Sequence, residues 1–523
     1  MSLKLIPMPQ KCAEALGEFI VCDATRILIA DARPELSRAA EYLADRMRPA
    51  TGFALPIATG APGQPDSIGL ALTPPDERLG AEGYRLRVAP DHVLLSAPTE
   101  AGLFYAIQTW AQLLPPQIES QWRVPVFDPI PPDCQLPPGW KAPAWRAPCV
   151  EIEDWPRFEW RGFMLDCSRH FRSVATLKWV IEKLARLKMN RFHLHLSDNH
   201  GWRVEVPKWP RLTQVGSCVE PEPRRHGFYT AADLREVVAY AARHHIMVIP
   251  EIDVPGHIFG AVAAYPDLCC TGKPIRNDLS HFHQLDILCA GNERVYEFLE
   301  DVFTTLASIF PAPYVHVGGD EAPKRRWRAC PKCQEVIRRE KLRDEEELQG
   351  YFVRRIADIV RRSGKRVIGW EEVINDQLPA DTIVQWWRRS TGNAGALEAF
   401  RKGHQVIVSR GDFSYLNAWK WQLPDFYQAE YFPREPLFHA HFDEVGSVEP
   451  EEWKSILGAE CCLWGETTPD ELVASRMFPT ILANAELAWR YPAPPQRDFG
   501  EFSKRVQALQ SYFEGTAKLT WGS

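Results

Sequence analysis

Eight short β-rich runs, each followed by a stretch with helical spacing, constrain the fold of this chain more than any other feature of its sequence. After the first run, Leu177, Val180, Ile181 and Leu184 recur at the spacing of one helix face. Strands that alternate with helices form parallel sheets, and eight such units over about 350 residues predict an α/β fold, a (β/α)8 TIM barrel with insertions. The runs are RGFMLDCSRH from Arg161, RFHLHLSD from Arg191, IMVIPEID from Ile246, YVHVGGDE from Tyr314, RVIGWEE from Arg366, TIVQWW from Thr382, QVIVSR from Gln405 and LGAECCLWGE from Leu457.

A second domain is expected, because 523 residues are too many for one ordinary core. In the first 120 residues, GYRLRVAPDHVLLSAP predicts a hairpin and GLFYAIQTWAQLL an amphipathic helix. Prolines then cluster between Pro115 and Pro148. We therefore predict a smaller α+β domain at 1–120, a Pro-rich linker at 121–155 and the barrel at 156–523.

The charge and hydropathy of the chain limit its partners. The formal net charge is -7, which argues against nucleic acid, because phosphate binding needs a basic surface. We find no segment that is long and apolar enough to cross a membrane, and the first residues, MSLKLIPMPQKC, lack the features of an export signal. We therefore expect a cytoplasmic protein as the sequence stands, or an exported one with its signal removed. A homodimer stays open.

The 13 cysteines favour reduced thiols over a disulfide framework, since the number is odd and two pairs are vicinal. Cys330 and Cys333 have the spacing of a zinc ribbon. No comparable CxxC or HxxxH pair follows them nearby, so we interpret the pair as a loop feature and expect no metal and no cofactor.

Polar and aromatic residues gather where the predicted strands end. In the second run, Phe192 and Leu194 share one face while His193 and His195 share the other, which predicts a polar barrel interior. Active sites on this fold lie at the carboxyl ends of the strands. Tryptophan offers a flat apolar surface to sugar rings, and the chain has 19. The residues at the strand ends are Asp166, Arg169, Asp198, Asp253, His257, Asp320, Glu321, Trp370, Glu371, Trp386, Trp387, Asp412, Tyr415, Asn417, Trp464 and Glu466.

Two acids in such a site suggest glycoside hydrolysis, which usually needs carboxylates about 5–5.5 Å or 6.5–9.5 Å apart, on either side of the bond. Asp320 and Glu321 are sequence neighbours, with Cα atoms about 3.8 Å apart, so they are poorly placed to act as acid and nucleophile. The 2-acetamido group of a substrate can supply the nucleophile instead. Glu321 would then be the general acid, and Asp320 would orient the acetamido group.

The motifs resemble glycoside hydrolase family 20, the β-N-acetylhexosaminidases. HVGGDEAPKRRW from His316 is similar to the active-site signature of that family. RGFMLDCSRHF, NRFHLHLSDNHGWRVE, PEIDVPGH, GWEE and LWGE match further segments in the same order, and GYRLRV and EAGLFYAIQTWAQLL resemble the N-terminal domain. The resemblance implies a retaining, exo-acting enzyme without a cofactor, acting on glycans that end in β-linked N-acetylglucosamine or N-acetylgalactosamine through an oxazolinium intermediate.

The resemblance also implies a role for each matching residue. Glu321 would be general acid and then general base, with its pKa raised by partial burial among tryptophans. Asp320 would position the acetamido group. Tyr415 would donate a hydrogen bond to the acetamido carbonyl, and Trp370, Trp386 and Trp464 would form the wall of the pocket. Arg169 and Glu466 would bind sugar hydroxyls. Asp198 and His257 would form a relay behind Glu321. Glu371 and Trp387 are interpreted as structural.

One position departs from the family pattern, which often has Tyr-x-Asp after the seventh strand. Here the run is Tyr415-Leu-Asn417, and an amide lacks the charge of a carboxylate. The departure affects how a distal sugar hydroxyl is held, and so the choice between the two N-acetylhexosamines.

Three other functions stay open. A barrel glycosidase for non-acetylated sugars would use Glu466 or Glu371 as the second carboxylate. A non-catalytic glycan-binding barrel would not need the Asp-Glu pair. A metalloenzyme could use His193, His195 and His257, because the first two share one strand face.

Overall fold

The computed structural model describes residues 3–119, 144–218, 222, 225–275, 285–388, 394–411, 414–417, 452–491 and 498–514. Asp412 lies outside these residues. The chain forms two compact units. The first comprises Met1–Glu159, Lys178–Met189 and Ala485–Ser523, and the second comprises Trp160–Leu177 and Asn190–Asn484.

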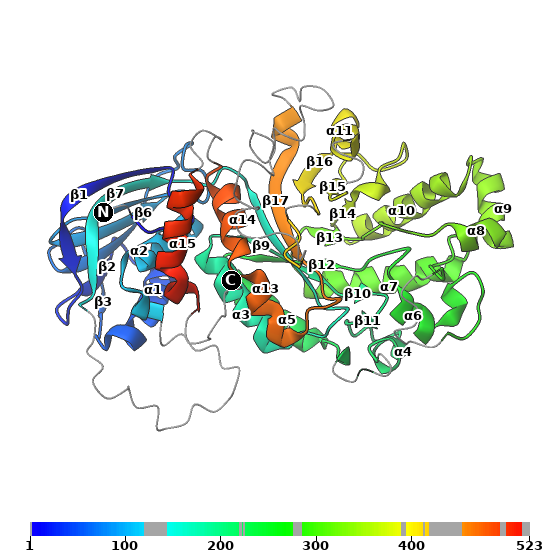
Figure 1. Cartoon of the computed structure of the whole chain (residues 1–523), viewed down its shortest axis with the longest axis horizontal. Helices are drawn as coiled ribbons and strands as arrows, with labels where there is room; N and C mark the ends of the chain where they lie inside the picture. Colours follow the sequence, from blue (N-terminus) through cyan, green and yellow to red (C-terminus); the bar gives the residue numbers. More distant parts are fainter. Residues whose placement is uncertain are drawn as a thin grey trace. The chain divides into compact units, whose positions relative to one another are not determined.

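The first unit contains a seven-stranded sheet with helices α1 (Pro34–Thr51) and α2 (Glu100–Leu113) side by side against it, as Figure 1 shows. The predicted hairpin is present, since β5 and β6 pair antiparallel around Pro90. The predicted helix is α2, which is buried on all sides from Gly102 to Leu113 and so is not amphipathic; it begins where the Thr99 side chain accepts a hydrogen bond from the Gly102 amide. In sheet order the strands are β1 (Lys11–Ile20), β7 (Arg146–Asp154), β5 (Tyr84–Val88), β6 (His92–Ala97), β4 (Ser67–Leu72), β2 (Arg26–Ile29) and β3 (Ile57–Thr59).

Two predicted domain boundaries differ from the structure. The predicted linker at 121–155 contains β7, which pairs with both β1 and β5 in the interior of the first sheet. At the other end, helix α15 (Phe499–Glu514) belongs to the first unit and not to the barrel. Both segments are held by partners far away in the sequence, which local composition does not reveal.

A buried ionic cluster connects α15 to the rest of the first unit. The guanidinium of Arg46 on α1 donates to Glu119 and, over 2.5 Å, to the hydroxyl of Tyr512 on α15. Arg186 forms an ion pair with the other oxygen of Glu119 at 2.8 Å. Since unpaired buried charges are costly, these four residues depend on one another.

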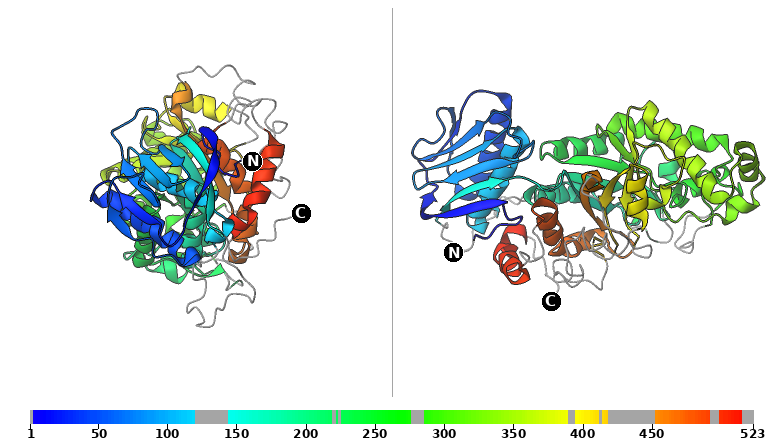
Figure 2. Two further views of the ribbon diagram at one scale, coloured as in Figure 1. Left: turned by 90° about the vertical axis from the view of Figure 1, so that its left-hand side faces the viewer. Right: turned by 90° about the horizontal axis from the view of Figure 1, so that it is seen from above.

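The second unit is a closed barrel of eight parallel strands, so the predicted (β/α)8 architecture and all eight predicted strand positions are confirmed. Figure 2 gives two further views of its strands and of the first sheet. In chain order the strands are β8 (Trp160–Asp166), β9 (Arg191–His195), β12 (Met247–Glu251), β13 (Tyr314–His316), β14 (Arg366–Trp370), β15 (Ile383–Trp386), β16 (Gln405–Val408) and β17 (Ile456–Leu463).

Apolar side chains from strands on opposite sides of the barrel meet in its interior: Trp160, Ile249, Ile368, Ile383, Ile407 and Leu457. A polar layer is also enclosed, because His193 on β9 hydrogen-bonds with Glu460 on β17 at 2.8 Å. The polar face predicted for β9 therefore points inward.

Helices alternate with the strands, and α5, α7 and α10 begin at side-chain caps. Thr230 and Asp233 form a capping box at the start of α5. None of the helices in the described ranges is long and apolar enough to cross a bilayer. The larger helices are α3 (Val174–Arg186), α5 (Ala231–Ala242), α7 (Glu293–Ile309), α10 (Glu345–Arg362), α11 (Ala394–Arg401) and α14 (Thr480–Trp489), with α6 (Phe259–Ala264), α8 (Arg325–Ala329) and α9 (Pro331–Glu340) in the connections.

Candidate active site

Asp320 and Glu321 lie in the loop that follows β13, and the two preceding glycines shape this loop. Gly318 has a φ of +66°, and a Cβ atom there would lie 1.7 Å from an oxygen of Asp253. The next residue, Gly319, donates its amide to that same oxygen at 3.0 Å. Only glycine permits this close approach, so the GGDE run positions both acids from the backbone upward.

The two adjacent acids have different surroundings. The Asp320 side chain is 10% exposed, whereas the Glu321 side chain is 60% exposed. The Nε2 atom of His257 lies 3.5 Å from an oxygen of each. One carboxylate is thus enclosed and the other accessible, as two distinct roles require.

The residues of the relay predicted behind Glu321 lie close together. His257 donates from Nδ1 to Asp198 at 3.0 Å. The other oxygen of Asp198 accepts from His195 Nε2 at 2.7 Å and lies 2.7 Å from a guanidinium nitrogen of Arg169. Asp198, Arg169 and His257 are therefore brought together as predicted.

Sequence reasoning missed Glu251, at the end of β12, which joins this relay to the barrel interior. Its carboxylate accepts from Trp370 Nε1 at 2.9 Å and lies 2.8 Å from His316 Nδ1 and 3.1 Å from His193 Nε2. It also hydrogen-bonds with His195. The sequence could have revealed Glu251 through the alternation of side chains along the strand, because residues two apart share a face and one face of each barrel strand points inward.

The histidines within the barrel are held between carboxylates. Both ring nitrogens of His193 and of His195 lie at hydrogen-bonding distance from acidic side chains. Burial acts to lower the pKa of His193, but the charges of Glu460 and Glu251 raise it to about 9. The flanking carboxylates therefore favour the charged form of both rings.

The acids at the site differ in how their surroundings affect the pKa. Burial, and then the charge of Asp320, raises the pKa of Asp253 well above its usual value. Burial also raises the pKa of Asp320, although the charge of His257 acts against it. Since close like charges disfavour two ionised groups, Asp253 and Asp320 do not readily carry two negative charges at once.

The pKa of Glu321 is shifted opposite to the prediction. A hydrogen bond from His257 lowers it, and partial burial acts in the other direction without prevailing. The charges of Asp198 and Asp320 raise the pKa of His257 well above its usual value, against the effect of burial. The two pKa shifts therefore favour the proton on His257 over the proton on Glu321.

An aromatic wall lies beside these acids. The rings of Trp370 and Trp464 are 5.9 Å apart, and Trp464 meets Tyr415 edge to face at 5.7 Å. Tyr415 stacks on Trp387 with an interplanar angle of 8°. The structure thus brings together Trp370, Trp464 and Tyr415 as predicted and adds Trp387, which the sequence had assigned to structure.

The prediction that Trp386 belongs to this wall is wrong. On β15, Ile383 and Gln385 point into the barrel, where Gln385 donates to Glu460. Residues 384 and 386 therefore point outward, and 387 continues the inward phase. Trp386 is fully buried with the guanidinium of Arg410 over its ring, 4.9 Å from the ring centroid.

The side chains predicted to bind sugar hydroxyls have unused hydrogen-bonding capacity. Arg169 lies over Trp464, 5.1 Å from the ring centroid, and 3.8 Å from Glu466. One oxygen each of Asp320, Glu466 and Asn417 is buried and accepts no hydrogen bond from the residues that the structure describes. Buried polar atoms are normally paired, so these three are available to a polar ligand.

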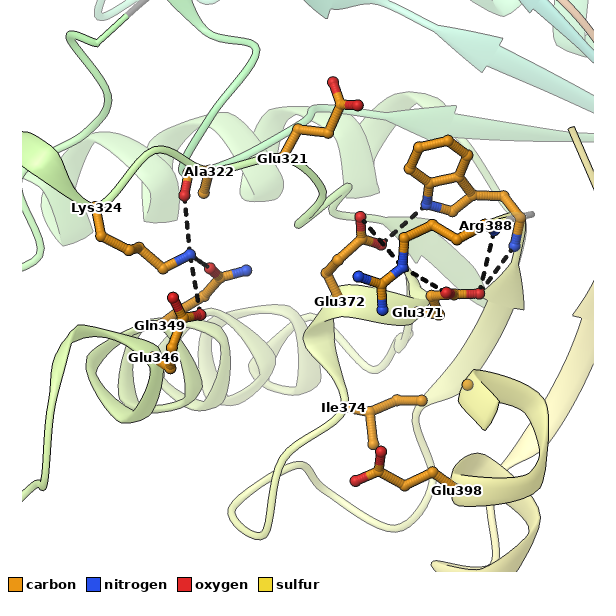
Figure 3. Close-up of a pocket in the computed structure, with 12 residues that line it drawn as sticks. Glu321, Ala322, Lys324, Glu346, Gln349, Glu371, Glu372, Ile374, Arg388 and Glu398 are labelled. Carbon is orange, nitrogen blue, oxygen red and sulfur yellow. Dashed lines mark hydrogen bonds and ion pairs between the residues drawn. The ribbon is translucent and has the colours of Figure 1, made fainter. Parts of the chain in front are cut away.

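A cavity of about 780 Å³ opens beside Glu321. Figure 3 shows Glu372 and Arg388 pointing toward one another on one side and Lys324 among Gln349 and Glu346 on the other. Burial, and then the charge of Asp320, raises the pKa of Glu372 to about 7. Its lining includes Glu321 and Trp387 but not Asp320, Trp370 or Trp464.

The interpretation of Cys330 and Cys333 as an isolated loop pair is wrong. Cys270 and Cys289 lie beside them, and the four sulfur atoms are all within 4.8 Å of one another. The second pair precedes the first in the chain and has a spacing of 19 residues, so a search for a following CxxC missed it.

Comparisons with known proteins agree with this geometry. The family description Glycosyl hydrolase family 20, catalytic domain, matches residues 158–492, and that of Glycosyl hydrolase family 20, domain 2, matches residues 2–155. A β-N-acetylhexosaminidase of Cellulomonas fimi is 33% identical over 96% of this chain and 92% of its own length. A β-hexosaminidase of Porphyromonas gingivalis is 36% identical over 96% of this chain, which spans only 62% of that relative.

Solved structures show the same likeness. The β-N-acetylhexosaminidase of Streptomyces coelicolor superposes with a TM-score of 0.80 at 30% identity, over 99% of each chain. The exo-β-N-acetylglucosaminidase of Vibrio harveyi, in complex with N-acetylglucosamine, gives 0.81 at 28% identity over 98% of this chain and 77% of the other. The match of the catalytic-domain description over residues 158–492, together with the 33% identity to the Cellulomonas fimi enzyme, shows that the chain belongs to glycoside hydrolase family 20.

Proposed function

We propose that this protein is an exo-acting, retaining β-N-acetylhexosaminidase that removes terminal β-linked N-acetylglucosamine or N-acetylgalactosamine with help from the substrate's acetamido group. The observation that supports this proposal most directly is the difference in exposure between two adjacent side chains: Asp320 is enclosed and Glu321 is accessible. Neighbouring residues cannot readily flank a sugar ring, so the nucleophile comes from the substrate.

In the first step the acetamido carbonyl oxygen attacks the anomeric carbon, and the bond to the leaving oxygen breaks. Glu321 gives its proton to that oxygen, and the sugar becomes an oxazolinium ion. In the second step Glu321 takes a proton from water, which attacks the same carbon and reopens the ring with overall retention. The pair of Glu321 and His257 loses one proton to the leaving oxygen in the first step and regains one from water in the second.

Asp320 is suited to the acetamido N–H because one of its oxygens is buried and unpaired among the described residues. An ionised carboxylate there accepts from the N–H and stabilises the positive charge of the oxazolinium ion. Burial and the charge of Asp320 raise the pKa of Asp253 well above its usual value, which disfavours a second negative charge at this position.

The remaining residues would hold the sugar. Tyr415 lies against Trp464 and Trp387, which form an apolar enclosure suited to the acetamido methyl group. Arg169 and Glu466 supply a donor and an acceptor for hydroxyls. A structure of the Streptomyces plicatus β-hexosaminidase, which is described as holding its product GlcNAc, has a TM-score of 0.79 at 31% identity.

The test is a comparison of hydrolysis rates on aryl β-glycosides of N-acetylglucosamine, N-acetylgalactosamine and glucose. We expect both acetamido sugars to react and the glucoside to be left almost intact, because it lacks the internal nucleophile. A thiazoline mimic of the oxazolinium ion should inhibit strongly. Comparable rates on the glucoside would contradict the proposal, as would indifference to the thiazoline.

A further inference from the structure

Four cysteines from two connections of the barrel converge beside α9, away from the acids described above. The Cys289 sulfur lies 3.7 Å from that of Cys330 and 3.6 Å from that of Cys333, and the Cys270 sulfur lies 3.8 Å from that of Cys333. These distances are far longer than the bond of about 2.05 Å in a disulfide. All four cysteines have free thiols in this structure.

The sulfur separations match a tetrahedral metal centre. Zinc binds thiolate sulfur at about 2.3 Å, and four sulfurs at the corners of such a tetrahedron lie about 3.8 Å from one another. Cys289, Cys330 and Cys333 are buried and Cys270 is half-buried, which is typical of a closed structural site. We propose that Cys270, Cys289, Cys330 and Cys333 bind one structural zinc ion as thiolates.

The backbone around the cluster has the features of a metal-binding loop. The amide of Gly291, two residues after Cys289, donates to the Cys289 sulfur. A Cβ atom on Gly291 would lie 2.3 Å from the carbonyl carbon of Lys332, so the two loops touch through their backbones. Amide donors to sulfur and close packing stabilise thiolates around a metal.

The zinc ion would join the connection after β12 to the connection after β13. Next to Cys289, Leu288 donates its amide to Pro255 at 3.1 Å and accepts from the Trp327 indole at 2.9 Å. Pro255 is close in sequence to His257, and Trp327 lies on α8 between Glu321 and Cys330. The site would therefore fix the two loops that present His257 and Glu321, without touching substrate.

The first test is the metal content of the wild-type protein, produced in zinc-supplemented medium and purified without chelator. Inductively coupled plasma mass spectrometry should find about one zinc per chain. Replacement by Co²⁺ should give the intense visible bands and the sulfur-to-metal charge-transfer band of a tetrahedral cobalt thiolate. Absence of zinc, iron in its place, or disulfides among these cysteines on non-reducing peptide mapping would each overturn the proposal.

A variant pair locates the metal within the chain. Cys330→Ser combined with Cys333→Ser removes two ligands, and we expect nearly all the zinc to be lost and the melting temperature to fall. The matched control is Cys269→Ser, next to Cys270, whose sulfur contacts Pro266 and Thr271 instead. It should keep its zinc.

Full zinc content in the double variant would overturn the assignment to these cysteines. If the double variant does not fold, the cobalt spectrum of the wild-type protein decides, because charge transfer from sulfur cannot arise at a site made of histidines and carboxylates.

Discussion

The Nε2 atom of His257 lies 3.5 Å from an oxygen of Glu321, and both residues have left-handed backbone conformations, with φ of +47° and +48°. Such conformations are uncommon outside glycine and persist where the surrounding structure enforces them. The histidine and the proposed acid are thus held together by their backbones, and we infer that they share a proton.

This sharing sets the pH dependence. The pKa of His257 is raised and that of Glu321 is lowered, so the last proton of the pair is lost only above the raised value. In His257→Asn the proton must reside on Glu321 alone, which loses it near the usual pKa of a carboxyl group. We expect the alkaline limb of kcat/KM against pH to move to lower pH.

The control for this profile is His244→Asn, on a histidine whose Nδ1 atom contacts Tyr240 at the end of α5. It should leave the limb in place. An alkaline limb at the same pH in wild type and His257→Asn would show that the histidine does not hold the proton.

Glu321→Gln removes the acid and keeps its shape. General acid catalysis contributes roughly 10²–10⁴-fold, and we expect a loss of this size on substrates with poor leaving groups. Aryl substrates with good leaving groups need less protonation and should lose less in the first step. An equal loss across a series of leaving groups, measured as kcat/KM, would contradict the role of acid.

Asp320→Asn keeps the side-chain volume and removes the negative charge. We expect kcat on an acetamido substrate to fall roughly 10²–10³-fold, as when one group that stabilises transition-state charge is lost. A rate within a few-fold of wild type would rule out substrate assistance through Asp320.

Trp387 and Trp386 provide a neighbouring pair with opposite expectations. Trp387→Phe removes a hydrogen bond to Glu372 of 2.9 Å and part of the stacking on Tyr415, so kcat/KM should fall about tenfold with a rise in KM. Trp386→Phe should lower the melting temperature and leave kcat/KM nearly unchanged. The reverse order of kinetic effects would place Trp386 in the wall after all.

Glu251→Gln tests the polar layer of the barrel. The substitution leaves the protonated rings of His193 and His195 short of a buried counter-charge, so the free energy of unfolding in urea should fall by about 3–5 kcal/mol. Glu335→Gln, at an exposed ion pair on α9, is the comparison and should change it little. Equal stability of the two variants would mean that Glu251 is dispensable.

The barrel could be predicted because each strand has its own run of β-rich residues in the sequence. Much of the site could be predicted because its acids and Trp370, Trp464 and Tyr415 lie at or just after strand ends. The error at Trp386 is one of phase: two adjacent tryptophans end the strand, and only the inward position of Gln385 distinguishes them. Two features could not be predicted: that Cys270 and Cys289 lie beside Cys330 and Cys333, and that the pKa of Glu321 is lowered. Both depend on residues that are distant in the sequence and meet only in the folded chain.

The place of α15 has a consequence for how the protein is made. Arg46 and Glu119 emerge early from the ribosome, whereas Tyr512, their partner on α15, follows after the whole barrel. At about 5–20 residues per second, the first sheet waits on the order of tens of seconds for its last helix. During that time the N-terminal unit lacks α15, and the surface that α15 later covers is exposed and open to binding by chaperones.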